Sequence, residues 1–326
     1  MALFLKQHLI PQTTREAAKA LFKRVMLRVE IETHSFCNRR CGYCPNVVGD
    51  RLGDNKRMPD RIFARIVADL GEIDYDRIVV FSGYNEPLAD RHILTRIADV
   101  RRAAPKSKIR TYTNGDYLKP DYLEELAEAG LSSMHISVHM NPEDVYSDTY
   151  ALNRIAEIAE RLHIRPEFKS VEPNFMIVAR FPHKRIDIDI RAIDYWVRGE
   201  NRAGLIEGIK EGHVRSAPCH FPFLHLYVGF EGNLVPCCHI RSDRPEHEKY
   251  RVGHIDDFGS IYEAFASKAM VGWRRHLAGF EKKASPCDTC SAPFLEGGEN
   301  QLRGYAPIFR RLFEPMLRQD AVKVAD

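Results

Sequence analysis

Strand-like segments alternate with helical segments between residues 29 and 210, and this alternation limits the folds open to the chain. Alternating or continuous apolar patterns predict strands and amphipathic patterns predict helices. The strands are expected at 29–33, 78–81, 109–113, 134–138 and 175–178, and the helices near 59–70, 89–103, 119–129 and 149–163. Such alternation is typical of βα units and a parallel sheet. Five or six units fit, fewer than the eight of a closed barrel. We therefore predict an α/β fold with a partial (β/α)6 barrel.

The pattern changes after about residue 212. Residues 224–228 alternate as a strand, Glu231, Gly232 and Asn233 supply a turn, and 234–235 return, which predicts a β-hairpin. A helix near 259–279 and a last helix near 305–318 follow. The predicted domains are an N-terminal helical extension (1–28), the partial barrel (29–211), a hairpin-plus-helix domain (212–293) and a C-terminal helix (294–326).

Composition narrows the classes of function. A formal net charge of +3 gives no support for a nucleic acid or membrane partner. The first six residues are too short an apolar run for a signal peptide, and no stretch approaches 18 consecutive apolar residues. We expect a cytoplasmic protein, in which eight cysteines are metal ligands rather than disulfide partners.

Three cysteines follow the first strand within eight residues: Cys37, Cys41 and Cys44. Soft thiolates select zinc, copper(I) or iron–sulfur clusters. A four-iron cubane held by protein alone needs four cysteines, so three leave one iron without a protein ligand. Such an open position is typical of a catalytic metal site. A zinc site or three buried structural thiols are the alternatives.

The CxxxCxxC loop, with Tyr43 before its last cysteine, resembles the signature of the radical S-adenosylmethionine superfamily. The resemblance implies a [4Fe-4S] cluster whose vacant iron chelates the amino and carboxylate groups of S-adenosyl-L-methionine. It further implies that the reduced cluster cleaves this cofactor to a 5′-deoxyadenosyl radical, which abstracts a substrate hydrogen. A flavodoxin or ferredoxin is the electron donor that such an enzyme implies.

Residues 82–87 are similar to the family's GGEP-type segment, with Asn85 where glycine is usual. The resemblance implies that Ser82, Gly83 and Glu86 hold the cofactor's ammonium group. Glycine lets the backbone approach closely, and a carboxylate pairs with a cation. A plain strand-to-helix turn is the alternative.

Further polar residues follow the predicted strands. By the same resemblance, Asn114 and Ser137 face the cofactor's ribose and carboxylate, and Arg202 lies in a short segment near the adenosine. His139 is either a catalytic residue or a satisfied core histidine. Arg180 either pairs with an anion of cofactor or substrate or is a surface arginine.

A second set of cysteines consists of Cys219, Cys237, Cys287 and Cys290. Their order around the hairpin resembles the auxiliary-cluster module called SPASM, in its shortened form called twitch. Four thiolates complete a second [4Fe-4S] cluster, which suits electron transfer. A four-thiolate zinc ribbon is the alternative. Cys238 is interpreted as a buried small hydrophobe or as a substitute for Cys237.

These features resemble twitch members of the 2-deoxy-scyllo-inosamine dehydrogenase type, which serve antibiotic biosynthesis; the run from Tyr43 to Asn46 is part of the likeness. The resemblance implies a radical oxidoreductase that oxidises a secondary alcohol of an aminocyclitol, sugar or nucleoside, with the auxiliary cluster as electron acceptor. His139, Arg180 and His183 are the candidates for taking the hydroxyl proton.

Several alternatives stay open. The same first cluster serves peptide-modifying enzymes and sugar epimerases, decarboxylases or dehydratases. Only about 28 residues precede the first strand, too few for a peptide-recognition domain. A non-catalytic zinc protein that binds nucleic acid is the alternative from another class, although its partner usually requires a concentrated basic face.

Overall fold

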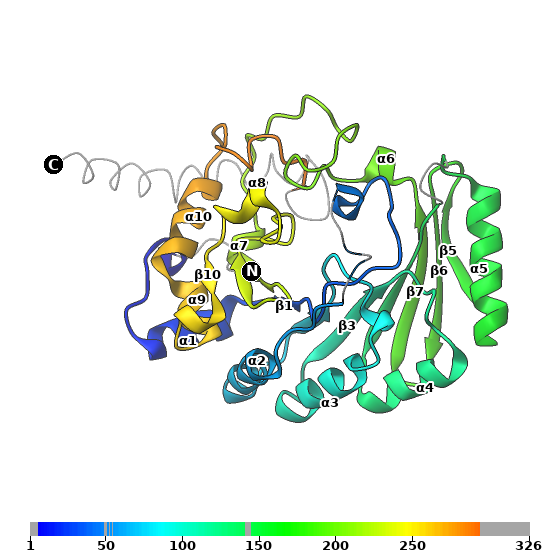
Figure 1. Cartoon of the computed structure of the whole chain (residues 1–326), viewed down its shortest axis with the longest axis horizontal. Coiled ribbons are helices and arrows are strands. Elements are labelled where there is room, and N and C mark those ends of the chain that lie inside the picture. Colours follow the sequence, from blue (N-terminus) through cyan, green and yellow to red (C-terminus); the bar gives the residue numbers. More distant parts are fainter. Residues whose placement is uncertain (1–5, 49–50, 52, 54, 141–144, 294–326) are drawn as a thin grey trace.

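The computed structural model describes residues 6–48, 51, 53, 55–140 and 145–293, which contain one ten-stranded sheet (Figure 1). The strand order is β10-β9-β8-β1-β2-β3-β4-β7-β6-β5. The strands are β1 (Arg28–Ile31), β2 (Ile78–Phe81), β3 (Lys108–Thr113), β4 (Ser133–Val138), β5 (Glu167–Glu172), β6 (Met176–His183), β7 (Ile186–Ile193), β8 (His225–Val228), β9 (Asn233–Val235) and β10 (Gly253–His254).

Six neighbouring strands, β8-β1-β2-β3-β4-β7, run parallel. Val29 of β1 lies between Val79 of β2 and Leu226 of β8 in this register. Antiparallel strands extend the sheet on both sides, β6 and β5 beyond β7 and β9 and β10 beyond β8. Because parallel strands end at the same edge, the loops after β1, β2, β3, β4 and β7 gather there.

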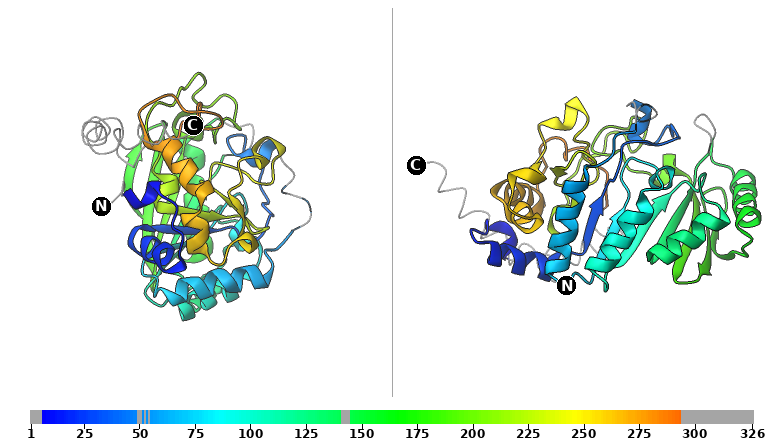
Figure 2. Two further views of the ribbon diagram at one scale, coloured as in Figure 1. Left: turned by 90° about the vertical axis from the view of Figure 1, so that its left-hand side faces the viewer. Right: turned by 60° about the horizontal axis from the view of Figure 1, so that its bottom comes forward.

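Helices connect and cover the strands. The longer ones are α1 (Arg15–Val25), α2 (Asp60–Glu72), α3 (Ile93–Ala103), α4 (Pro120–Ala129), α5 (Asp148–Leu162), α9 (Ile261–Ala266) and α10 (Lys268–Ala278). The short ones are η1 (Lys6–Leu9), η2 (Pro45–Val48), η3 (Pro87–Ala89), α6 (Tyr195–Arg198), α7 (Phe221–Leu224), α8 (Pro245–Glu248) and η4 (Ile255–Asp257). Helices α2, α3 and α4 lie side by side on one face of the sheet, and α1 packs against α9 at one end of it (Figures 1 and 2). None of the described helices is long and apolar enough to span a membrane.

Local sequence sets several helix ends. Helix α1 begins after Thr14, whose side chain accepts a hydrogen bond from the Ala17 N–H, and α5 begins after Ser147, which caps Tyr150 in the same way. Helix α4 ends at Gly130, which has a φ of 103°, in the left-handed region that glycine tolerates best.

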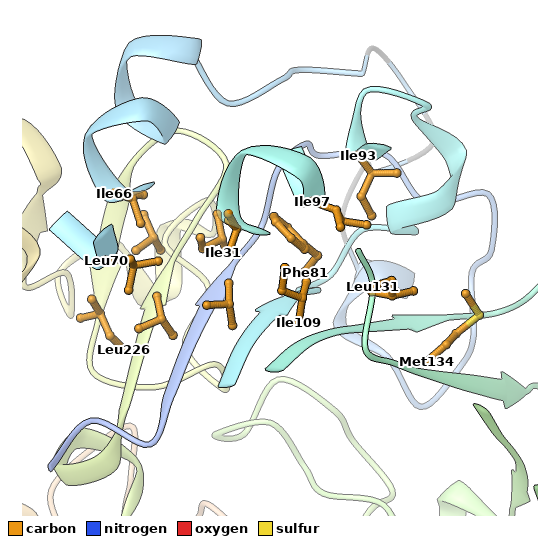
Figure 3. Packing of buried hydrophobic residues seen from close by; sticks show 14 of the residues in the cluster. Ile31, Ile66, Leu70, Phe81, Ile93, Ile97, Ile109, Leu131, Met134 and Leu226 are labelled. Carbon is orange, nitrogen blue, oxygen red and sulfur yellow. The ribbon is translucent and has the colours of Figure 1, made fainter. Parts of the chain in front are cut away.

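The main core lies between the sheet and the helices on that face (Figure 3). It combines apolar side chains of adjoining elements: Ile31, Phe81, Ile109, Met134 and Leu226 from strands, Ile66 and Leu70 from α2, and Ile93 and Ile97 from α3. Each is nearly or fully buried, and burial of one such side chain stabilises the fold by roughly 1.5–3 kcal/mol. This core fixes the positions from which the loops of the site emerge.

The predicted α/β class with six parallel strands is confirmed, but the strands are distributed differently from the expectation. Only five of the six parallel strands precede residue 210, because the sixth is β8, from beyond the predicted boundary at 211. The strand expected at 175–178 is β6, which runs antiparallel, and the alternating segment 186–193 forms the parallel β7.

In the C-terminal part, the predicted hairpin is confirmed as β8 and β9. The single helix expected at 259–279 is two helices, α9 and α10, which meet at Ser267. The helix expected at 294–326 lies outside the described residues. The four predicted domain ranges stay a prediction.

Candidate functional site

A cavity of about 460 Å³ lies along the parallel strands, at the loops that follow them. It brings together nearly all the side chains singled out in the sequence: Cys37, Cys41, Tyr43, Cys44, Ser82, Gly83, Glu86, Asn114, Ser137, His139 and Arg202. These residues come from five separate loops or strand ends. Their convergence on one space makes this cavity the candidate site.

The first cysteine group, Cys37, Cys41 and Cys44, occupies the loop after β1. The N–H of Cys44 donates to the carbonyl of Cys41 over 2.9 Å, and the N–H of Cys37 donates to the carbonyl of Arg51 over 2.9 Å. The same loop is fastened to the loop after β3 through Arg39, whose guanidinium binds both carboxylate oxygens of Asp116 at 2.7 Å.

The protonation of these thiols indicates what they can bind. None of the three is in a disulfide. Burial raises the pKa of Cys37 to about 11 and that of Cys41 to about 12. Thiolates at these positions therefore need a cation beside them, which a metal centre supplies. Three thiols on one loop, facing a large cavity, fit a four-iron cubane with one iron left open to a small ligand.

The loop after β2 brings the backbone at Gly83 close to the side chain of Glu32. A Cβ at Gly83 would lie 2.7 Å from Oε1 of Glu32, so a larger residue cannot fit there without displacing that side chain. Oε1 of Glu32 also accepts the Tyr84 N–H over 2.8 Å. The side-chain amide atoms of Asn85, which lines the cavity, are buried and have no hydrogen-bond partner among the described residues.

Glu86 is a buried carboxylate at the cavity wall, 2% exposed. Its Oε1 accepts from the Thr113 hydroxyl over 2.5 Å, and its Oε2 accepts from the Asn114 N–H over 2.7 Å. Burial raises the pKa of Glu86 to about 7, although these hydrogen bonds oppose the shift. A carboxylate in such a place gains most from a cationic ligand.

An aromatic cluster forms another wall. The rings of Tyr43 and Tyr195 stack with centroids 4.6 Å apart, and the Tyr43 hydroxyl lies 2.9 Å from Nδ1 of His139. Burial lowers the pKa of His139 to about 3, so its imidazole is neutral at physiological pH. Ser137 is hydrogen-bonded to Tyr195 in the same cluster.

The two predicted arginines differ in their placement. Arg202 lines the cavity and has a left-handed φ of 51°; its carbonyl accepts the Leu205 N–H over 3.3 Å, whereas its guanidinium makes none of the side-chain hydrogen bonds found among the described residues. Arg180 is exposed on β6, opposite Asp189, and does not line the cavity. A different arginine, Arg191 of β7, lines it instead.

The second cysteine group, Cys219, Cys237, Cys287 and Cys290, surrounds a smaller cavity. Burial raises the pKa of Cys219 and of Cys237, so these thiols also need a cation to ionise. Cys238 does not join them but lines the larger cavity. Four thiols around one space fit a cubane without an open iron. Among the described residues no group of three or more His, Cys, Asp or Glu side chains is arranged to hold a single metal ion.

Two side chains, Phe221 and His239, line both cavities. His239 is 2% exposed, and its Nε2 lies 3.1 Å from Oε2 of Glu200, which also lines the larger cavity. The two cysteine groups therefore face spaces with a common wall.

Sequence reasoning missed the cavity residues Arg191, Tyr195, Glu200 and His239. A signal existed for Arg191, because residues 186–190 alternate isoleucine with aspartate, as a half-buried strand does. Tyr195 lies five residues beyond that segment, at the start of α6. Glu200 and His239 carry no local pattern, and only the fold brings them to the cavity.

Two family models match the chain: the radical SAM superfamily over residues 31–166 and SPASM, an iron–sulfur cluster-binding domain, over residues 219–291. A S-adenosyl-L-methionine-dependent 2-deoxy-scyllo-inosamine dehydrogenase from Niallia circulans is 22% identical over 264 residues, covering 81% of this chain and 92% of that protein. A GTP 3′,8-cyclase from Alkaliphilus oremlandii (strain OhILAs) is 26% identical over 196 residues, covering 56% of this chain and 60% of that protein.

Among solved structures, BtrN in complex with AdoMet and 2-DOIA has a similar fold. Its TM-score is 0.60 at 20% sequence identity, over 82% of this chain and 94% of that one.

Proposed function

Because the chain is a radical S-adenosylmethionine enzyme with a SPASM-type iron–sulfur domain, we propose that it is a dehydrogenase that oxidises a secondary alcohol of an aminocyclitol, a sugar or a nucleoside. When bound, S-adenosylmethionine and two [4Fe-4S] clusters would supply a 5′-deoxyadenosyl radical and an electron acceptor. The observation that carries the proposal is the pair of cysteine groups facing two cavities with a common wall.

The chain's own residues divide the work of holding the cofactor. The first cysteine group holds the cluster with the open iron. Glu86, buried and readily deprotonated beside a cation, receives the ammonium group of the cofactor. The polar and backbone surface around it comes from Ser82, Gly83, Asn114 and Ser137, and the aromatic surface comes from Tyr43. Arg202 offers its guanidinium to an anionic group.

The rest of the cavity suits a substrate with many hydroxyl or amino groups. Its lining includes Arg28, Glu30, Tyr112, His135 and Arg191, which offer donors and acceptors from β1, β3, β4 and β7. Sites built from such groups bind a polar ring well and reject analogues that leave them unpaired.

The oxidation removes a hydrogen atom, a proton and an electron from the alcohol. The cofactor bound at the first cysteine group would supply the acceptor for the hydrogen atom, and a cluster held by Cys219, Cys237, Cys287 and Cys290 would supply the acceptor for the electron. Glu200 is our assignment for the proton, because its carboxylate lines the cavity and contacts His239 at the common wall. His139 is a weak base at a pKa of about 3, and neither Arg180 nor His183 lines the cavity.

The test is turnover of a labelled substrate by anaerobically reconstituted protein, with dithionite or a flavodoxin or ferredoxin as reductant. 2-Deoxy-scyllo-inosamine carrying deuterium at the carbinol carbon is the first substrate, followed by a panel of sugars and nucleosides. We expect a ketone and deuterium in 5′-deoxyadenosine in equal amounts. Deuterium transfer with an epimerised, decarboxylated or dehydrated product would replace the dehydrogenase with one of those reactions.

A further inference from the structure

Arg215 lies beside the second cysteine group and is almost fully buried, with 3% of its surface exposed. It lines the same small cavity as the four thiols. Burial of a guanidinium is costly unless its donors are satisfied, so a cation in this position requires a compensating role or partner.

The partners of Arg215 are neutral. Its guanidinium makes four hydrogen bonds to backbone carbonyls, which belong to Ala217 (3.2 Å), Pro218 (2.8 Å), Cys290 (3.2 Å) and Ala292 (2.6 Å). Within the described part of the chain it forms no ion pair with a carboxylate. Its donors are satisfied, but its charge is not neutralised by any of these partners.

A second buried cation lies nearby. Lys283 is 3% exposed, and its Nζ donates to the carbonyl of Gly279 over 2.5 Å. The Lys283 N–H donates to the Arg215 carbonyl over 3.3 Å. The carboxylates of this region are on more open residues, because Asp288 is half-buried and Glu281 is exposed.

The charge of Arg215 reaches the thiols. Its guanidinium lines the same small cavity as the four cysteines, and one of its nitrogens donates to the carbonyl of Cys290, itself one of the four. A buried cation at this position stabilises negative charge in the cavity, because the attraction is Coulombic and the surroundings are poorly solvated.

We propose that Arg215, assisted by Lys283, raises the reduction potential of the cluster held by the second cysteine group and thereby fits that cluster to accept the substrate's electron. Reduction adds one negative charge to a cluster that is already anionic, and nearby buried cations stabilise the reduced form more than the oxidised form. Net charge and local hydrogen bonding are the features by which proteins set such potentials. The inference rests on the proposed function, because it assumes an iron–sulfur cluster at this group.

The experiment is an EPR-monitored redox titration of the full-length, reconstituted protein that carries Cys41→Ala. This change is expected to prevent assembly of the first cluster, so that the signal comes from the second cluster. Arg215→Gln should shift the midpoint to a more negative potential, whereas Arg215→Lys, which keeps the charge, should stay close to the parent. Arg274→Gln is the matched control, since Arg274 is fully buried and also bonded to backbone carbonyls but does not line the cavity. Its midpoint should not move.

An Arg215→Gln protein with full iron content and an unchanged midpoint overturns the inference. If that variant does not assemble the cluster, Lys283→Met decides: a more negative midpoint supports the inference, and an unchanged one overturns it. The proposed function fails in a different way, through zinc in place of iron at the second group or full ketone formation without that group. An unchanged midpoint together with normal ketone formation would contradict the role of Arg215 and Lys283 in setting the potential, while the proposed function would stand.

Discussion

The two cysteine groups contain the same ligand chemistry in two different settings. The first offers three thiols to a cavity of about 460 Å³ that also contains the carboxylate of Glu86. The second encloses a smaller space with four thiols and mostly apolar neighbours. The difference indicates that the first group is shaped to admit a reactant and the second to exclude one.

The charges around the two groups also differ. The arginine of the first loop, Arg39, is neutralised by Asp116, whereas the hydrogen bonds of the Arg215 guanidinium within the described residues all go to backbone carbonyls. An electron placed at the second group is therefore stabilised by a buried cation. The two groups thus differ both in the count of thiols and in the balance of nearby charge, as the proposed division between radical generation and electron acceptance requires.

The largest effect is expected from Cys41→Ala, which removes one of three thiols from the first group. Formation of 5′-deoxyadenosine from S-adenosylmethionine and dithionite should be lost completely, because the cluster with the open iron cannot assemble. Product analysis by mass spectrometry measures this. Cys238→Ala is the matched control, a cysteine of the same cavity outside the triad, and it should keep its iron. Deoxyadenosine formation by Cys41→Ala would contradict the assignment of the cluster with the open iron to the first group.

Cys287→Ala removes one thiol from the second cysteine group and leaves the first group unchanged. Iron content should fall from about eight to about four atoms per chain, while 5′-deoxyadenosine still forms. Ketone formation should be lost, because no acceptor for the second electron remains. Iron analysis and product assay of the same sample provide the measurement. Full ketone formation in this variant would contradict the role of the second group.

The pH dependence of stability tests the buried carboxylate of the first cavity. The pKa of Glu86 is about 7 in the folded chain and near 4.5 when unfolded, so the folded state favours the protonated form. Its contribution is fully present below about pH 4.5 and is lost as pH rises through 7, a change of up to ~3 kcal/mol. Thermal unfolding should show the wild type losing stability relative to Glu86→Gln over this range. If the stability of the two proteins changed in parallel with pH, the raised pKa of Glu86 in the folded chain would be refuted.

The smallest effect is expected from Gly83→Ala. The added Cβ would meet the side chain of Glu32 at 2.7 Å and force the loop to shift, at a cost of about 1–3 kcal/mol. Binding of S-adenosylmethionine, measured by equilibrium dialysis, should weaken while the second cluster stays intact. Gly272→Ala on α10 is the control, because nothing lies within 4 Å of its added Cβ. If both variants bound S-adenosylmethionine equally well, the lack of a side chain at Gly83 would not matter for binding.

The sequence predicts those parts of the site that depend on local spacing. Cys37, Cys41, Cys44 and the segment that ends in Glu86 follow recognisable strands, so their meeting at one edge of a parallel sheet could be inferred before any coordinates. The parallel pairing of β8 with β1 could not, because it joins strands almost 200 residues apart and leaves no periodic signal.

The same limit applies to charge. Arg215 is followed by Ser-Ala-Pro in an unremarkable loop, and its burial depends on carbonyls from residues 290 and 292. Arg180 was a candidate in the sequence, yet it lies exposed on the antiparallel strand β6. Whether an arginine is solvated or buried depends on which strand neighbours it acquires, and that is set by tertiary pairing.

Electron–nuclear double resonance can detect whether the cofactor binds to the iron of the first group. The sample is reduced protein with S-adenosylmethionine that carries ¹⁷O in its carboxylate. A label bound to iron gives a hyperfine coupling that a distant label does not. We expect this coupling in the wild type and in Cys287→Ala, and none in Cys41→Ala. A coupling that survives in Cys41→Ala, or is absent from the wild type, would contradict the claim that the first group leaves an iron open to the cofactor.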